Sequence, residues 1–228
     1  MSVVNETGPR IVGRAPGAPR RTVLLTGASG VVGRALLQRL DDLDVVCLVH
    51  RSPVSGPHVT AVPGDIAEPM LGLAEQAYAE LAAKVDAVIH CAAITDFNRS
   101  DGSLDATNIA GTGHVAAFAA AANAVLYHVS TAFVRTTVDG DRGRKAVGYA
   151  SSKAAAEELL RSRGLAHVVL RPSIVIGDSV TGEIGAFQGL HQVVGGLFAG
   201  IVPMMRGPVS LATSMASPDQ QALACSPS

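Results

Sequence analysis

The stretch "RTVLLTGASGVVGRALLQRL", residues 21–40, joins a short apolar run to a helical pattern through three evenly spaced glycines, Gly27, Gly30 and Gly33. In such a connection the first glycine permits a tight turn, the second lets backbone approach a pyrophosphate, and the third lets the helix pack on the strand. The N-terminus of the helix would present free N–H groups to a phosphate. The stretch predicts a dinucleotide site, and the alternative is a glycine-rich turn without a ligand.

The rest of the chain alternates short apolar runs with helical patterns. Valine-rich runs predict strands over residues 22–25, 45–49, 59–62, 87–91, 125–129 and 168–170. Helical spacing is present over residues 32–40, 71–81 and 115–122, and from about Tyr149 to Gly164. Most of the runs are continuously apolar, which is typical of strands covered on both faces. This order predicts the α/β class, a doubly wound parallel sheet of the Rossmann type.

The composition excludes several classes of protein. The 228 residues are 48% apolar and 16% charged with a net charge of −1, which fits a globular domain and gives no reason to expect nucleic-acid binding. No apolar run is long enough for a membrane span, and no metal-binding motif is present, so we expect no metal. The cysteines Cys47, Cys91 and Cys225 form no CxxC pair, which favours a reducing, cytoplasmic location. Cys47 and Cys91 fall in predicted strands, where thiols pack as small hydrophobes.

The end of the second predicted strand, "VVCLVHRS", indicates which nicotinamide cofactor is used. An NAD site usually has an acidic residue there to bind the ribose 2′-OH, whereas this chain has His50 and Arg51. A guanidinium can bind a 2′-phosphate through two hydrogen bonds, so we expect NADPH, with Arg34 as a second partner. The alternative for Arg51 is a solvated loop cation.

A tyrosine and a lysine in "GYASSKAAAEELL" carry the candidate chemistry. Tyr149 and Lys153 are four residues apart at the start of a predicted helix, which places them on one face. A lysine ammonium beside a phenol lowers its pKa, so that it can give a proton to a carbonyl oxygen. Ser130 and Thr131, at the end of the fifth predicted strand, could hold that oxygen. The alternative is an amphipathic helix that carries Tyr and Lys by chance.

Several motifs in order give the chain a resemblance to a known superfamily. They are "TGASGVVG", "GDI" (64–66), "HCAA" (90–93), "NIAGT" (108–112), "STAFV", "YASSK" and "RPSIVIGDS" (171–179). Together they resemble the extended branch of the short-chain dehydrogenases/reductases over residues 21–180. Within that branch, "VCLVHR", "GDIAEPMLGL", "AAITDF" and "HVSTAFV" are similar to the male-sterility-type fatty acyl-CoA reductase and thioester reductase group. One departure is Ala154, where many members of the group carry a bulky aromatic residue.

The resemblance implies an enzyme that uses NADPH to reduce an acyl thioester to an aldehyde. It implies Thr131 as the hydroxyl that orients the substrate, Tyr149 as the general acid, and Lys153 as the group that tunes Tyr149 and contacts the ribose. Asp65 would lie near the adenine amino group. The full set of implied cofactor contacts is Gly27, Ser29, Gly30, Val31, Val32, Gly33, Arg34, Arg51, Asp65, Ile66, Ala92, Ala93, Asn108, Tyr149, Lys153, Pro172 and Ile174.

The resemblance also divides the chain. We predict a flexible N-terminal tail over residues 1–20, an NAD(P)-binding Rossmann domain over 21–206 with a helical segment at 187–205, and an irregular tail over 207–228. Family members have a further C-terminal substrate domain, which is short or missing here. The chain could be truncated, it could be complete with an open pocket, or a partner subunit could supply the missing wall.

Other functions and candidate residues stay open at this point. A dehydrogenase/isomerase or epimerase acting on a sterol-like or sugar-nucleotide substrate could use the same residues, and a non-catalytic NADPH-binding protein or an inactive fragment is the third reading. Superfamily members are commonly dimers, so a homodimer is one option, and the sequence does not determine the oligomeric state. Asp96 and Phe97 could border the substrate or belong to a plain loop. A predicted basic loop before Tyr149 (Arg142, Arg144, Lys145) could be solvated or contact a phosphate-bearing substrate. The strand histidines His90 and His128 are expected to be core residues.

Overall fold

The computed structural model describes residues 20–95, 102–135, 143–175, 177 and 182. Six strands form one parallel sheet in the order β3-β2-β1-β4-β5-β6. Their bounds are β1 Thr22–Thr26, β2 Asp44–Val49, β3 Val59–Pro63, β4 Ala87–His90, β5 Val125–Val129 and β6 His167–Leu170. Each lies within one residue, at either end, of a strand predicted from the sequence. The doubly wound fold is confirmed, and the strand order reverses between β1 and β4, where such sheets bind ligands.

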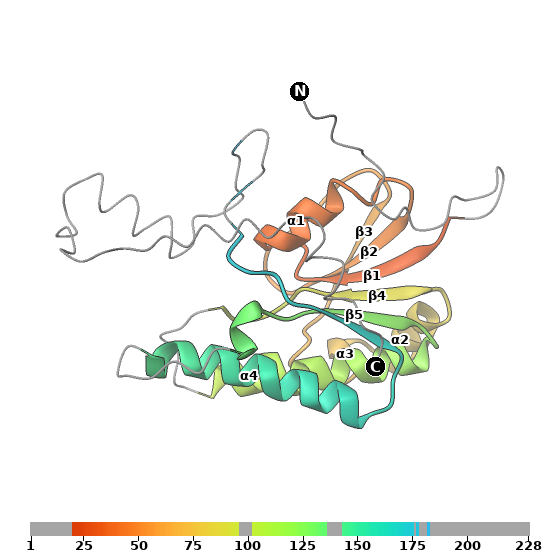
Figure 1. Ribbon diagram of the computed structural model, residues 1–228. Coiled ribbons are helices and arrows are strands. Elements are labelled where there is room, and N and C mark those ends of the chain that lie inside the picture. The colour runs from red at the N-terminus through yellow and green to blue at the C-terminus, as the bar shows by residue number, and fades with distance from the viewer. Residues whose placement is uncertain (1–19, 96–101, 136–142, 176, 178–181, 183–228) are drawn as a thin grey trace.

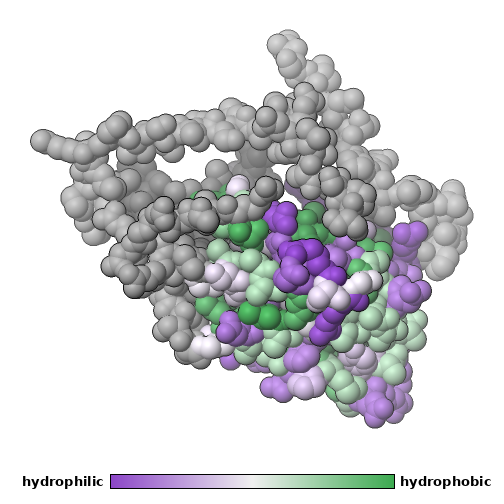
Figure 2. Space-filling model, turned by 60° about the horizontal axis from the view of Figure 1, so that its bottom comes forward, coloured by the Kyte–Doolittle hydropathy of each residue, from purple (hydrophilic) through white to green (hydrophobic). Residues whose placement is uncertain are grey.

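Helices cover the two faces of the sheet unequally. Helix α1 (Val31–Leu37) lies on one face, and α2 (Glu75–Ala82), α3 (Gly111–Ala121) and α4 (Gly143–Ser162) lie on the other (Figure 1). Three short helical segments complete the described elements: η1 (Pro69–Gly72), η2 (Asp105–Ala110), which leads directly into α3, and η3 (Ala132–Arg135). The molecular surface on the side of the larger helix layer mixes hydrophilic and hydrophobic residues (Figure 2).

Two helix starts differ from the prediction. The helix expected from Leu71 begins at Glu75, because Met70 and Leu71 have positive φ angles in the turn η1, where Leu71 is fully buried. The helix expected from Tyr149 begins at Gly143, so that residue lies inside α4. The predicted basic loop was therefore wrong, because residues 144 and 145 are helical.

Side-chain alternation along the strands divides the core into two clusters. Leu24, Val88 and Leu126 face the larger helix layer and pack with residues such as Phe118. Val23, Leu25, Val45 and Cys47 face the other side, against Leu36 and Leu37 of α1. Tyr78 of α2 meets Phe118 of α3 edge to face, with ring centroids 5.1 Å apart.

Strand β5 is covered on one face alone in the described part of the chain, unlike the expected strand buried on both faces. Leu126 and His128 are buried, whereas Val125 and Tyr127 are each 37% exposed. The reason is that the cluster around α1 extends over β1, β2 and β4 and does not include β5.

Several sequence predictions lie outside the described residues. These are the N-terminal tail apart from Arg20, the candidate substrate residues Asp96 and Phe97, Arg142, the helical segment 187–205 and the tail 207–228. Within the described ranges no helix is both long enough and apolar enough to cross a membrane.

Candidate active site

The glycine-rich turn after β1 has the close packing that its spacing predicts. Gly27 has a φ of +73°, and a Cβ there would lie 2.5 Å from the backbone nitrogen of Ala92. A Cβ on Gly33 would lie 2.2 Å from the carbonyl oxygen of Gly27. The N–H of Gly30 donates to that same oxygen at 3.0 Å and closes the turn. Gly33 is therefore required by packing within the turn and Gly27 by packing against the segment after β4, while Gly30 is exposed at the pocket.

A pocket of about 630 Å³ opens at the C-terminal edge of the sheet, between the turn after β1 and the segments that follow β2, β3 and β4. It lies at the point where the strand order reverses. The described residues fit a dinucleotide there, since the glycine turn leaves backbone exposed where a side chain would fill the space.

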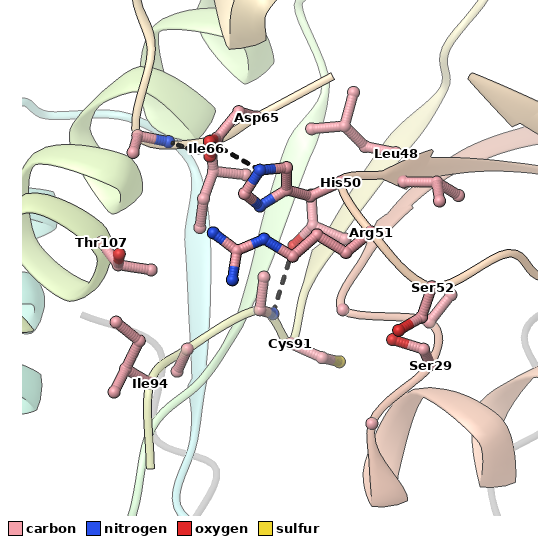
Figure 3. A pocket seen from close by; sticks show the side chains of 18 of the residues that line it. Ser29, Leu48, His50, Arg51, Ser52, Asp65, Ile66, Cys91, Ile94 and Thr107 are labelled. Atoms are coloured by element: carbon pink, nitrogen blue, oxygen red, sulfur yellow. Dashed lines mark hydrogen bonds and ion pairs between the residues drawn. The ribbon is translucent and has the colours of Figure 1, made fainter. Parts of the chain in front are cut away.

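The wall that follows β2 carries the positive charge of the pocket. His50 reaches toward Asp65 and the Arg51 side chain lies beside it, while the hydroxyls of Ser29 and Ser52 point toward each other (Figure 3). Asp65 is the one carboxylate among the described residues that line the pocket, and it is already engaged: Oδ1 accepts from the N–H of Ala67 at 2.9 Å, and Oδ2 lies 3.4 Å from His50 Nε2. An anion bound at this wall would contact the guanidinium of Arg51 and the hydroxyl groups of Ser29 and Ser52.

The structure brings about half of the expected cofactor residues to this pocket. Those that line it are Gly27, Ser29, Gly30, Arg51, Asp65, Ile66, Ala92 and Ala93. Those that do not are Val31, Val32, Gly33, Arg34, Asn108, Tyr149, Lys153, Pro172 and Ile174. Arg34, expected as a second phosphate partner, donates its Nε–H to the carbonyl oxygen of Ser29 at 2.9 Å.

The two hydroxyl residues after β5 have different surroundings, as strand alternation predicts. Ser130 donates to Glu157 Oε1 at 2.5 Å, and Arg171 binds both oxygens of that carboxylate, at 3.0 and 2.6 Å. Thr131 is buried and its Oγ1 accepts from the N–H of Phe133 at 3.3 Å. Ser130 therefore attaches the end of β5 to α4, whereas the Thr131 hydroxyl contacts backbone within its own turn.

Tyr149 and Lys153 are both buried on α4. Burial raises the pKa of Tyr149, so the expectation that Lys153 lowers it is not met in this structure. Burial also lowers the pKa of Lys153 to about 8, against smaller opposite effects of Cys91 and Glu157. The Nζ of Lys153 lies 3.2 Å from His128 Nε2. Lys153 thus lies close both to β5 and to Cys91, which lines the pocket.

A chain of hydrogen bonds connects the pocket to the first turn around Tyr149. The side chain of Asn108 accepts from the N–H of Ile94 at 2.9 Å and donates to the carbonyl oxygen of the same residue at 3.0 Å. It also donates to Ser152 Oγ at 3.0 Å, and Ser152 donates to the carbonyl oxygen of Tyr149 at 2.8 Å. Ile94 lines the pocket, so these hydrogen bonds connect the segment of α4 around Tyr149 to the pocket.

Sequence reasoning missed several residues of the site. Cys91 lies just beyond β4 and packs against the cluster around α1, as expected of its thiol, but it also lines the pocket. Glu157 lies one helical turn after Lys153, and this spacing could have indicated that the two side chains share a helix face. His128 was expected to be a satisfied core residue, but its Nδ1 has no hydrogen-bond partner among the described residues.

Comparison with known proteins places this geometry in a family. A family model described as "Male sterility protein" matches residues 54–224. The chain belongs to this family. The male sterility family lies in the extended branch of the short-chain dehydrogenases/reductases, which confirms the resemblance inferred from the motifs.

The chain is also similar to individual proteins of known sequence or structure. An isonitrile lipopeptide synthase of Streptomyces coeruleorubidus is 35% identical over 83% of this chain. The terminal R domain of the myxalamid PKS-NRPS pathway shares 31% identity with a TM-score of 0.68 over 79% of this chain. WbmH of Bordetella bronchiseptica, solved in complex with NAD+, shares 25% identity with a TM-score of 0.57 over 80% of this chain and 64% of its own. This chain of the male sterility family covers 15% of the length of the synthase and 55% of the length of the R domain.

Proposed function

We propose that the chain is an NADPH-dependent reductase of an acyl thioester. The observation that carries the proposal is the hydrogen-bond chain from the pocket through Asn108 to the backbone of Tyr149. This connection between the pocket and the part of α4 that carries Tyr149 and Lys153 supports the proposal that cofactor and catalytic residues work together. The similarity to R domains of synthases, and to a protein solved with NAD+, supports the substrate class and a nicotinamide cofactor.

Residues of the pocket would hold the cofactor, which when bound supplies a hydride. The turn with Gly27 and Gly30 would hold the pyrophosphate, and Asp65 and Ile66 would lie on the adenine side. Arg51, with the Ser29 and Ser52 hydroxyls, would bind a 2′-phosphate. Asp65 does not oppose this assignment, because its two oxygens already face the N–H of Ala67 and His50.

The catalytic residues would act on the carbonyl of the thioester. Thr131 would donate a hydrogen bond to the carbonyl oxygen, and Tyr149 would give that oxygen a proton as the carbon is reduced. Burial raises the pKa of Tyr149, which keeps the phenol protonated but makes it a weaker acid, so the positive charge of Lys153 would have to favour the proton transfer. Loss of the thiol from the reduced carbon then gives an aldehyde and a free thiol. Lys153 lies on the same helix face, and its ammonium would compensate the negative charge that the phenol carries after the proton has left.

The cofactor part is tested by binding. We expect Arg51→Ala to weaken NADPH binding by about 10- to 100-fold, because hydrogen bonds to charged groups contribute about 1.5–3 kcal/mol, and to leave NADH binding nearly unchanged. Arg21→Ala is the matched control, since Arg21 is exposed next to the opposite end of β1. Equal loss for both dinucleotides, or no loss, contradicts the 2′-phosphate assignment.

The catalytic part is tested by turnover with an acyl-thioester and product analysis. We expect Tyr149→Phe to retain NADPH binding and to lower turnover by about 10²- to 10⁴-fold. Tyr127→Phe, on the exposed side of β5, is the control and should retain turnover. Retained turnover in Tyr149→Phe contradicts the assignment. Conversion of a sugar nucleotide without net consumption of NADPH would favour an epimerase instead.

A further inference from the structure

His128 lies beside Lys153 and has no part of its own in the proposed chemistry. It is paired in register with His90 on the neighbouring strand, and both rings face the larger helix layer with centroids 5.2 Å apart. The Nε2 of His128 is 3.2 Å from Lys153 Nζ, and both side chains are almost completely buried. A buried amine therefore has an imidazole as its hydrogen-bond partner.

In this cluster the lysine is the group that changes charge near neutral pH. Burial lowers the pKa of His128 far below its usual value, and Lys153, His90 and His167 lower it further, so the imidazole stays neutral. The groups around Lys153 are Cys91 after β4, His90 and His128 on the strands, and Tyr149 and Glu157 on its own helix. Burial brings the pKa of Lys153 to about 8.

A neutral imidazole has one N–H and one lone pair, so its partner determines which nitrogen carries the proton. Facing an ammonium, His128 Nε2 has to accept, and the proton lies on Nδ1. Facing a neutral amine, Nε2–H can donate, and Nδ1 keeps a lone pair. Because Nδ1 has no partner among the described residues, the second arrangement avoids burying an unpaired N–H.

His90 provides an internal comparison because its tautomer is fixed. The hydroxyl of Thr112 donates to the carbonyl oxygen of Asn108 at 2.7 Å, so its oxygen can only accept from His90 Nε2–H, at 3.1 Å. The Nδ1 of His90 then accepts from the hydroxyl of Thr26 at 2.7 Å. The tautomer of His90 is therefore fixed by Thr112 and Thr26 and does not depend on the charge of Lys153.

We propose that His128 is a positioning residue that holds the Lys153 side chain beneath the pocket and changes tautomer when the lysine gains or loses its proton. The inference rests on the role of Lys153 in the proposed function. The change of tautomer at His128 gives Lys153 a hydrogen-bond partner in both of its protonation states. The amine therefore keeps its position while its charge changes.

The direct test is ¹⁵N NMR of the full chain labelled at histidine, with long-range ¹H–¹⁵N correlations recorded between about pH 6.5 and 9.5. The His128 signals are assigned with His128→Gln. We expect His128 to change from the Nδ1–H form to the Nε2–H form with a midpoint near the lysine pKa of about 8, while His90 keeps the Nε2–H form. In Lys153→Met the change should disappear. One unchanging His128 tautomer in the unsubstituted chain, or a change that persists without the lysine, overturns the proposal.

Binding of NADPH as a function of pH gives a second readout. Because the Lys153 ammonium is expected to contact the ribose, NADPH binding should weaken as the pH rises through the lysine pKa. His128→Met leaves the ammonium without its acceptor, so we expect this loss of binding to move about one unit to lower pH. His128→Gln offers both a donor and an acceptor and should restore most of the original profile. An unchanged profile in His128→Met overturns the positioning role. Failure of the unsubstituted chain to bind NADPH would instead contradict the proposed function, and the NMR result would still decide the tautomer change.

Discussion

Arg171→Met breaks an ion pair that joins the ends of two strands to helix α4. Arg171 follows β6 and binds both carboxylate oxygens of Glu157, which also accepts from Ser130 at the end of β5. The side chain of Glu157 is 3% exposed, whereas that of Arg171 is 40% exposed. Removal of the guanidinium would leave a buried carboxylate with one hydroxyl donor.

The expected loss of stability follows from this asymmetry. Removing one partner of a fully buried pair costs about 3–5 kcal/mol. Because water reaches Arg171 and the Ser130 hydroxyl remains, we expect about 2–3 kcal/mol at pH 7, or a decrease in Tm of about 5–10 °C. The substitution should also lower turnover, because Thr131 follows Ser130 directly and its position depends on the attachment of β5 to α4.

The pKa of Glu157 determines how the loss of stability in Arg171→Met changes with pH. Burial raises the pKa of Glu157, but hydrogen bonds from Arg171 and Ser130 lower it more, so its pKa in the folded chain is below the usual value. A lowered pKa stabilises the fold above the unfolded value, and this contribution is lost as the pH falls through the folded pKa. In Arg171→Met the carboxyl pKa rises. The deficit relative to the unsubstituted chain should therefore be largest at pH 7 and shrink toward pH 4.

Urea denaturation followed by circular dichroism at pH 7 and pH 5 measures the effect, with Glu157→Gln and the double variant completing a double-mutant cycle. We expect the double variant to be more stable than the sum of the single changes predicts, because neither charge is then left unpaired. A loss of less than about 1 kcal/mol in Arg171→Met, well below the range for a buried pair, or simple additivity in the cycle, would refute the reasoning.

Three further substitutions test the packing and the charge of the site. Gly33→Ala should destabilise the chain by about 1–3 kcal/mol in a thermal melt and weaken dinucleotide binding, since its Cβ would lie 2.2 Å from the oxygen of Gly27; an unchanged Tm contradicts this. Phe118→Ala should cost about 3–5 kcal/mol in urea denaturation, because the ring is fully buried against Tyr78, and a loss below 1 kcal/mol argues against the core described above. The lowered pKa of Lys153 means that the unfolded chain binds more protons between about pH 8 and the usual lysine value. Stability measured by urea denaturation should therefore rise over that range in the unsubstituted chain and stay flatter in Lys153→Met.

Local patterns in the sequence were sufficient for the strands and the glycine turn. Each strand is a short apolar run, in most cases rich in valine, and all six were placed within one residue at either end. The glycine spacing predicted a turn whose sterics depend on neighbouring backbone, and the contacts of Gly27 and Gly33 confirm it. The helix starts were harder, because Leu71 satisfies a helical pattern and yet is buried in the turn before α2.

The candidate site was predictable to the extent that its residues follow strand ends or a known spacing. Thr131, Tyr149 and Lys153 were named in this way, and their catalytic roles stay predictions. The partners of those residues could not be predicted, because they come from distant parts of the chain. Glu157 meets Arg171 from another element, and the distance between the two in sequence carries no signal.

By itself, the sequence determined the order of strands and helices, the edge at which a nucleotide pocket would form, and the family. Those properties depend on side-chain period, glycine spacing and motif order, all of which are local. The tertiary structure alone decided that Lys153 faces His128, that Tyr149 is buried, and that Asp65 is engaged by its neighbours. A buried group takes its protonation state from whatever packs against it, and that depends on the three-dimensional arrangement of the sheet and α4.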